Sequence, residues 1–292
     1  MEGQLWKGIV MVLSQVHKRR KRAAESFSDE EIVRVFYWAV IHDRPISWAC
    51  QRRNWPLHLR HKVLPSDTTM SRRQRCPHVV ALLDAIEQRV TRPEQPGLYW
   101  MIDGKPLVIG GCSKDRQAGY GKAAASKAKG YKLHAIVAPD NSLAAWRIAP
   151  MNKDERVMAK RLLRSPYLQG YIVGDANYDS NQLHEICMAR GNCQFVTRRR
   201  YGAGRKVGHR AQSPGRLRSI ALLENPWPLF GDQLIHQRGA IERSFGNATN
   251  WGGALTHLPP WVRTHRRVRR WVQAKLTLTA LRRATIKATY VN

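Results

Sequence analysis

Three carboxylates stand out because each follows or borders an apolar segment. Asp103 comes directly after the apolar run 99–102, Asp175 follows the run 171–174, and Glu242 neighbours the apolar stripe of a predicted helix. Burying a carboxylate is costly unless a cation or hydrogen bonds compensate its charge. Carboxylate oxygens are also the ligands that the hard cation Mg²⁺ prefers. Two strand ends and one helix could therefore bring three acids together on Mg²⁺.

Each of these acids also has an ordinary structural explanation. Asp103 could serve as a turn residue. Asp175 could hold a strand-to-helix turn, although Asp179 already supplies a helix cap there. Glu242 could form a surface ion pair with Arg238 four residues earlier, which stabilises a helix by about 0.2–0.5 kcal/mol. The order of the elements that carry the three acids favours catalysis over three separate structural roles.

The first part of the chain, residues 1–95, is predicted to be a small helical DNA-binding domain. Ser28 begins a capping-box pattern before apolar residues at helical spacing, and Ser66 begins a polar helix further on. This order suits a helix-turn-helix that lays its last helix on DNA. The alternative is a helical bundle whose arginines only face solvent. The residues predicted to contact DNA are Arg72, Arg73 and Arg75.

The remaining part, residues 96–292, changes to short apolar strands that alternate with helices. Strands are predicted at 98–102, 131–138, 143–148, 171–173 and 194–197, and helices at 154–163, 181–190 and 235–245, with one more after Pro260. A basic stretch with Gly and Pro, residues 198–232, predicts an insertion or a mobile loop. The pattern is that of an α/β domain.

The chain is strongly basic. Its 292 residues include 50 Lys+Arg against 21 Asp+Glu, which gives a formal charge of +29. Such an excess repels itself in a compact body, so a polyanion is the expected partner. The basic residues are spread along the chain and are not gathered on one amphipathic helix, which favours nucleic acid over an anionic membrane surface.

Several other classes of protein are excluded. No apolar run approaches the ~20 residues that span a bilayer, and the chain does not begin with a signal-peptide pattern, so we expect a cytoplasmic protein. Its 5 cysteines include no C-x-x-C pair. This argues against both a disulfide framework and a structural zinc site.

Four motifs occur in the order typical of one known family. They are Ile-Asp-Gly-Lys-Pro at 102–106, Gly-Tyr-Lys-Leu-His at 130–134, Asp-Ala-Asn-Tyr-Asp-Ser at 175–180 and Arg-x-x-x-Glu at 238–242. With them the chain resembles a DDE transposase of bacterial insertion sequences, from about Leu98 to the C-terminal helix. The stretch 198–232 lies outside the resemblance. The resemblance implies a ribonuclease H-like fold, a mixed five-stranded sheet flanked by helices.

The resemblance also implies a reaction. Asp103, Asp175 and Glu242 would hold two Mg²⁺ ions, with Mn²⁺ as a substitute, that clamp the scissile phosphate. The site would first cut DNA at the transposon ends and then join the freed 3′-hydroxyl to target DNA. The partner is double-stranded DNA, a homodimer on that DNA is compatible with the resemblance, and the expected location is the nucleoid.

Further residues are predicted to assist the three acids. Tyr178 would pack and orient the loop of the second aspartate. Arg238, Lys105 and Lys132 would contact DNA phosphates. His134 is interpreted as a core histidine and is left out of the site.

Two positions depart from the family pattern. Ile235 and Thr249 stand where the family often has tyrosine and lysine. A lysine at the second position could hold a DNA phosphate, and its absence keeps open a non-catalytic DNA-binding protein, a decayed or domesticated transposase. A metal-dependent nuclease of the same fold, which would cut DNA without joining it, is a further alternative.

Overall fold

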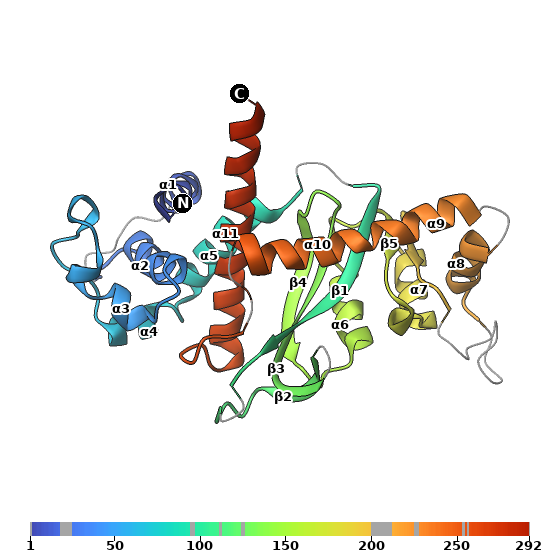
Figure 1. The fold of residues 1–292 in the computed structure, drawn as a ribbon, viewed down its shortest axis with the longest axis horizontal. Coiled ribbons are helices and arrows are strands. Elements are labelled where there is room, and N and C mark those ends of the chain that lie inside the picture. Colours follow the sequence, from blue (N-terminus) through green and yellow to red (C-terminus); the bar gives the residue numbers. More distant parts are fainter. Residues whose placement is uncertain are drawn as a thin grey trace. The chain divides into compact units, whose positions relative to one another are not determined.

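A computed structural model of the chain describes residues 2–17, 25–93, 97–110, 113–123, 126–199, 212–224, 228–252, 255 and 257–291. The chain forms two compact units, whose elements are labelled in Figure 1. The first unit combines Met1–Thr91 with Ala248–Leu255 and Arg270–Asn292, and the second combines Arg92–Asn247 with Thr256–Arg269. The C-terminal helix therefore contributes to both units. The division into a DNA-binding domain 1–95 and a catalytic domain 96–292 stays a prediction.

The first unit is helical. Its elements are α1 Glu2–Val16, α2 Asp29–Ile41, α3 Ile46–Ala49, η1 Arg52–Asn54, η2 Leu57–Leu59, α4 Asp67–Arg73, α5 Pro77–Thr91, the π-helical turn η4 Ala248–Gly252 and the larger part of α11 His265–Val291. The predicted capping box is confirmed, since the Ser28 hydroxyl accepts from the Glu31 amide and the Glu31 carboxylate accepts from the Ser28 amide. Among the described helices, none combines the length and the apolar character needed to cross a membrane.

Tryptophans form the centre of this helical unit. The Trp38 and Trp55 rings stack with centroids 4.6 Å apart, and Trp6 meets both of them edge-on. The Trp55 indole nitrogen donates a hydrogen bond to the Ala49 carbonyl oxygen at 2.7 Å. Aromatic pairs of this kind contribute about 0.5–1.5 kcal/mol beyond the area that they bury. They join α1, α2 and the turn after η1 into one core.

The prediction that Arg73 contacts DNA is corrected by the position of its side chain. Its side chain on α4 is buried, and its guanidinium donates to the Asp29 carboxylate and to the Phe27 carbonyl oxygen. Asp29 is 2% exposed, so this pair neutralises a charge inside the helical unit. Arg73 therefore holds α4 against the start of α2 instead of facing DNA, whereas Arg72 and Arg75 are exposed.

The second unit contains a 6-stranded mixed sheet. Its strands are β1 Tyr99–Val108, β2 Gly119–Ala123, β3 Ser126–Val137, β4 Leu143–Pro150, β5 Gly170–Val173 and β6 Cys193–Val196. The order is β2-β3-β1-β5-β6, with β4 paired to β3. β5 runs parallel to β1 and to β6, and the other pairs are antiparallel. The predicted mixed sheet with flanking helices is confirmed, and β2 is a strand beyond the five predicted.

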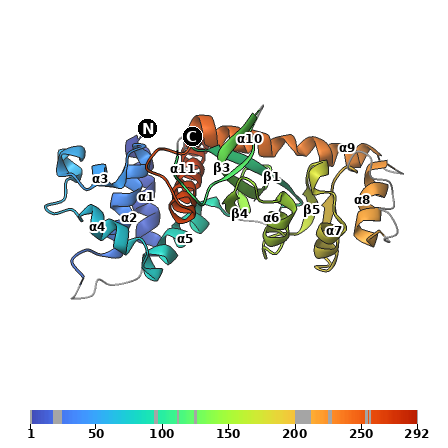
Figure 2. The same cartoon turned by 90° about the horizontal axis from the view of Figure 1, so that it is seen from below.

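Helices cover both faces of this sheet, as Figures 1 and 2 show. α6 Glu155–Leu162 and α7 Asn181–Met188 lie on one face, and α9 Pro228–Gln237 and α10 Gly239–Asn247 lie on the other. α8 Pro214–Glu224 packs against α7, α9 and β6. Each face of the sheet is therefore buried by a different pair of helices.

Strand β1 shows which side chains face which helices. Trp100 and Ile102 belong to an apolar core that α6 and α7 complete. Successive side chains of a strand point to opposite faces, so the odd-numbered residues of β1 face α9 and α10. Tyr99 accordingly packs against a second core that contains Leu234 of α9.

The basic stretch 198–232 differs from the predicted loop. Its described part contains α8 and the beginning of α9, while residues 200–211 and 225–227 lie outside the described ranges. Arg216 of α8 is buried and bonds to the Asp179 carboxylate. Such tertiary contacts stabilise α8. The Gly and Pro content of this stretch had favoured a loop in the sequence-based prediction.

We predict that Arg73→Ala lowers the free energy of unfolding by about 3–5 kcal/mol, because it leaves the buried Asp29 carboxylate without its guanidinium partner. Urea denaturation at neutral pH measures the loss. Arg75→Ala is the matched control, since this exposed arginine should change the free energy of unfolding by less than about 0.5 kcal/mol. Equal losses in the two variants would show that the Arg73–Asp29 pair adds nothing to stability.

Candidate active site

Asp103 lies inside the central strand of the sheet. β1 pairs with β5 from Tyr99 to Met101, and it continues along β3 to Val108. The prediction that the strand ends at Asp103 is wrong, because backbone bonds to β3 carry β1 beyond the end of β5. Asp103 therefore stands just past the last residue of β1 that pairs with β5.

Asp175 follows β5 at the same level of the sheet. Met101 pairs with Val173 in parallel register, and Asp103 and Asp175 each come two residues later. The Asp175 carboxylate also caps the turn η3 Ala176–Tyr178, since its Oδ1 accepts from a backbone amide of that turn at 2.9 Å. The structural role considered for Asp175 is thus present, and it holds the carboxylate beside β1.

Both aspartates point to the face of the sheet that carries α9 and α10. Val173 packs with Leu234 of α9, and the alternation of side chains along the strands gives Asp103 and Asp175 the same side. α10 packs against β1 on this face. Glu242 of α10 therefore belongs to the same side of the sheet as the two aspartates.

The Asp103 carboxyl is largely removed from water. Burial raises its pKa from 3.8 to about 6, a hydrogen bond from the Gly104 amide opposes that rise, and the charges of Asp175 and Glu155 reinforce it. The positive charge of Arg238 opposes the rise more weakly. A buried carboxylate beside two other acids is unfavourable when ionised, and a cation among them would lower the pKa again.

Glu242 faces solvent in this arrangement. Its side chain is 61% exposed, and it accepts a hydrogen bond from Arg238, one turn earlier, at 3.3 Å. Arg238 also interacts with Asp103, so the start of α10 lies near the aspartates. An exposed helical pair of this kind contributes only about 0.3–0.5 kcal/mol. Breaking the Glu242–Arg238 pair therefore costs little.

Glu155 is the acid that sequence reasoning missed. It opens α6, and its carboxylate pairs with the Lys132 ammonium and bonds to the Tyr178 hydroxyl. Burial, followed by the charges of Glu155, Asp103 and Asp175, raises the pKa of Tyr178, so this hydroxyl keeps its proton. The signal for Glu155 in the sequence was only its place in the first turn of a predicted helix, which many surface acids share.

Gly104 leaves room for the side chains that lie on the face of β1 opposite Asp103. A β-carbon at this position would come within 2.8 Å of Lys132, 3.4 Å of Glu155 and 3.4 Å of His134. His134 is buried, and burial together with the charge of Lys132 lowers its pKa to about 4. It is therefore a neutral core residue on β3, the strand next to β1, where it pairs with Gly104.

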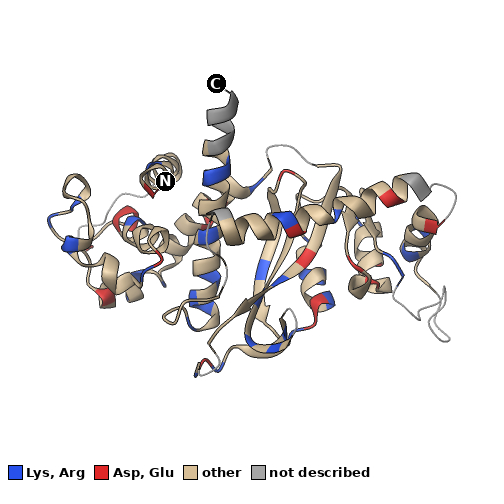
Figure 3. Ribbon diagram, viewed as in Figure 1, with Lys and Arg blue, Asp and Glu red and all other residues tan. Residues whose placement is uncertain are grey.

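The lysines predicted to contact DNA lie partly inside the protein. The Lys132 side chain is 13% exposed and pairs with Glu155, and burial lowers the pKa of Lys105. Arg238 is 36% exposed and bonds to Glu242. Figure 3 shows further Lys and Arg residues on helices and strands along the chain. For Lys132 a phosphate contact would compete with its ion pair, and the DNA contacts of all three residues stay predictions.

The chemistry of these groups fits a hard divalent cation. Asp103 and Asp175 offer oxygen ligands on one face of the sheet, and positive charge relieves their mutual repulsion. Within the ranges that the structure describes, no three His, Cys, Asp or Glu side chains stand in a ready arrangement for a metal ion. A metal site of Asp103, Asp175 and Glu242 therefore requires the Glu242 side chain to turn toward the aspartates.

Comparison with known proteins gives one family. The chain matches the family model described as Transposase DDE domain over residues 75–278. No curated protein sequence matches the chain. Among solved structures, a piggyBac transposase synaptic complex with hairpin DNA is similar to it with a TM-score of 0.44 and 10% sequence identity, over 96% of this chain and 70% of that chain.

We predict that Asp103→Asn stabilises the metal-free protein at neutral pH by about 2–3 kcal/mol, since one pKa unit corresponds to about 1.36 kcal/mol. The folded-state pKa of about 6 lies above the ordinary 3.8, so the folded protein binds this proton more tightly than the unfolded chain. The wild-type protein therefore loses stability as the pH rises through this interval. Asparagine has no such proton and keeps an oxygen for the Gly104 amide.

Urea denaturation in the presence of EDTA measures this difference. The two proteins should converge below about pH 4, and the variant should be the more stable one near neutral pH. Excess Mg²⁺ should then stabilise the wild-type protein and leave the variant unchanged. Parallel pH profiles in the two proteins would show that the Asp103 carboxylate is not held out of water.

Proposed function

Because this chain belongs to the family of transposase DDE domains, and is thus a DNA transposase, we propose that Asp103, Asp175 and Glu242 form its catalytic centre. The observation that carries the proposal is the pair of aspartates on adjacent parallel strands, at one level, with the buried Asp103 carboxyl beside Asp175. Glu242 would join them from α10, which packs against β1.

The reaction is the breakage and joining of phosphodiester bonds. At a transposon end, water attacks phosphorus and the P–O3′ bond breaks, which leaves a 3′-hydroxyl on the transposon strand. That hydroxyl attacks a phosphorus of the target DNA, forms a new P–O bond and displaces the target 3′-oxygen. Two Mg²⁺ ions, or Mn²⁺, would activate the attacking oxygen and stabilise the leaving oxygen when bound to the three acids.

The side chains around the acids have separate tasks in this proposal. Asp103 is central, because it neighbours Asp175 and also interacts with Arg238 at the start of α10. Once Glu242 turns toward Asp103, Arg238 is available to bind a phosphate of the scissile strand. A guanidinium can bind a phosphate through two parallel hydrogen bonds. Tyr178 keeps its proton and bonds to Glu155, which fastens the Asp175 turn against α6.

Double-stranded DNA is the substrate that suits the rest of the chain. The formal charge of +29 supplies phosphate contacts that do not depend on sequence. Recognition of the transposon ends would come from the exposed Arg72 and Arg75 on and after α4. A homodimer would hold two transposon ends at once, and the protein would act at the nucleoid.

A transposase that has lost catalysis is the second candidate, and Thr249 is the observation that favours it. The residue lies in η4, where its hydroxyl bonds to the Leu255 carbonyl oxygen at 3.4 Å. A threonine offers no positive charge to a phosphate. Incubation with the DNA that flanks its own gene and Mg²⁺ separates the candidates: joined products indicate a transposase, cut ends alone a nuclease, and bound but intact DNA a decayed transposase.

We predict that Asp103→Ala, Asp175→Ala and Glu242→Ala each lower DNA cleavage by at least about a thousandfold and leave DNA affinity within about twofold, because metal ligation and phosphate contact are separate tasks. Cleavage of a labelled transposon end and gel-shift titration measure the two quantities. Glu185→Ala is the matched control, an exposed acid on α7 that should change neither. Cleavage within about tenfold of wild type in any of the three variants would remove that residue from the site.

We predict that Arg72→Ala and Arg75→Ala each weaken binding to transposon ends more than binding to unrelated DNA, because both arginines face solvent on the predicted recognition segment. Competition gel shifts measure the ratio of the two affinities. Arg161→Ala on α6 is the exposed control. An unchanged ratio in both arginine variants would place end recognition elsewhere in the chain.

A further inference from the structure

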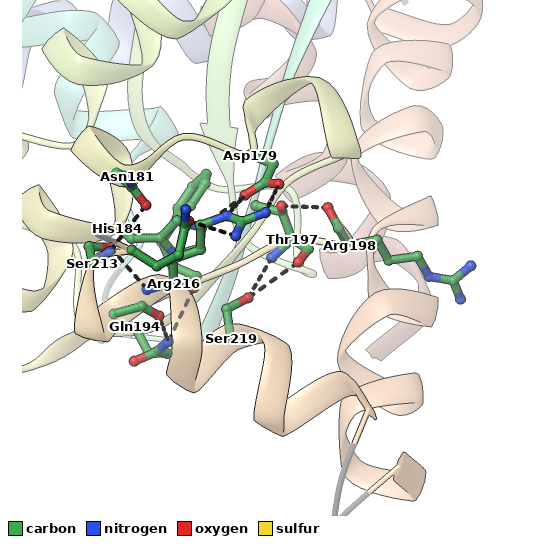
Figure 4. Close-up of polar contacts among 12 residues, drawn as sticks. Asp179, Asn181, His184, Gln194, Thr197, Arg198, Ser213, Arg216 and Ser219 are labelled. Carbon is green, nitrogen blue, oxygen red and sulfur yellow. Dashed lines mark hydrogen bonds and ion pairs between the residues drawn. The ribbon is translucent and has the colours of Figure 1, made fainter. Parts of the chain in front are cut away.

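Arg216 and Asp179 form a buried bidentate ion pair, called the fork below, at the end of the turn that begins at Asp175. The Arg216 Nε and Nη2 atoms donate to the Asp179 Oδ1 and Oδ2 atoms, both at 2.7 Å. Figure 4 shows the guanidinium aimed at the carboxylate. Their side chains are 3% and 5% exposed. Two parallel charge-assisted bonds fix orientation as well as distance, and lysine cannot reproduce them.

The helix that carries Arg216 is attached at several further points. The Ser213 amide donates to the Asn181 side chain at 3.2 Å, and the Ser219 hydroxyl accepts from the Thr197 amide at 3.1 Å. A β-carbon at Gly215 would come within 3.1 Å of a backbone oxygen of α7. α8 therefore lies tightly against α7 and the end of β6, and it gives Arg216 a rigid base.

Asp179 ends the same short turn that Asp175 begins. The Tyr178 amide donates to the Asp175 carbonyl oxygen at 3.1 Å, and the Asp179 amide donates to the Ala176 carbonyl oxygen at 3.2 Å. The Asp175 carboxylate accepts from the Asn177 amide inside this turn. Because these bonds connect successive residues, a shift of Asp179 moves the backbone that holds the Asp175 carboxylate.

The Arg216 guanidinium compensates the negative charge of the Asp179 carboxylate. The carboxylate is buried, and the nearby His184 Nε2 atom lies 3.7 Å from its Oδ1. A buried carboxylate that loses a charged partner is strongly destabilised and tends to move toward water. Loss of the guanidinium would therefore loosen the end of the turn opposite Asp175.

We propose that Arg216 is a positioning residue of the catalytic centre: through its fork with Asp179 it holds the 175–179 turn so that Asp175 faces Asp103. This inference rests on the proposed function of Asp175 as a metal ligand. Arg216 touches neither the metal nor the DNA in this role. It acts on metal affinity through the backbone of the turn, as outer partners of metal ligands do.

The test compares Arg216→Gln, which removes the charge and the fork, with Arg216→Lys, which keeps the charge and loses the fork. Arg218→Gln is the matched control, an exposed arginine two residues along the same helix. Mn²⁺ is titrated into each full-length protein without DNA, and the rise in melting temperature gives its apparent affinity. Cleavage of the transposon end at increasing Mn²⁺ and the affinity for that DNA are measured in parallel.

We expect Arg216→Gln to raise the half-saturating Mn²⁺ concentration about tenfold or more in both titrations, with DNA affinity within about twofold of wild type. Arg216→Lys should fall between Arg216→Gln and wild type, because an ammonium neutralises Asp179 without fixing its orientation. Arg218→Gln should match wild type.

Two outcomes would overturn the inference. Unchanged Mn²⁺ dependence in folded Arg216→Gln would show that the fork does not position Asp175. Loss of a cooperative melting transition in both Arg216 variants would show that Arg216 is a residue of the fold alone. Asp175→Asn in the same titrations separates the two proposals: if this variant binds Mn²⁺ as wild type does, the proposed function has failed, and if only the Arg216 variants do so, the inference has failed.

Discussion

The charge of Asp103, held largely out of water near two other acids, is the constraint on which the rest of the second unit depends. Burial and the neighbouring Asp175 and Glu155 raise its pKa, with partial opposition from the Gly104 amide. In a chain with 50 Lys+Arg, basic side chains lie close by, yet Lys132 pairs with Glu155 and Arg238 bonds to Glu242. The repulsion is thus only partly cancelled, and a divalent cation is the partner that would cancel it.

Backbone geometry keeps these charges where they are. β1 runs on along β3 after β5 has ended, and the parallel register sets Asp103 and Asp175 at one level. The turn after β5 is closed by its own hydrogen bonds and is held at its far end by Arg216. The charged groups lie on different faces of the sheet. The aspartates face α10, and the Glu155–Lys132 pair lies at α6.

Local patterns predicted most elements correctly. The Ser28 capping box and the strands β3 and β4 depend on neighbouring residues, so their signals are complete within a short window. β2 was not foreseen, because its sequence Gly-Tyr-Gly-Lys-Ala lacks an apolar run. Arg73 was predicted to contact DNA because its basic helix follows a helix-turn-helix order. The carboxylate with which it pairs inside the protein, that of Asp29, lies 44 residues away in the chain. No local pattern carries that information.

The sequence by itself determined the basic charge, the α/β order of the elements and the family of the chain. Charge follows from composition, and motifs and apolar periodicity are properties of residues close together in the chain. Only the tertiary structure decided which charges meet. It brought Glu155 of α6 near enough to Asp103 for its charge to raise the Asp103 pKa, and it left Glu242 exposed beside Arg238. It also folded part of a stretch predicted to be an insertion or a loop into the helix that carries Arg216. The physical reason is that burial and ion pairing are set by distances in space, and these arise only when strands and helices far apart in the chain pack together.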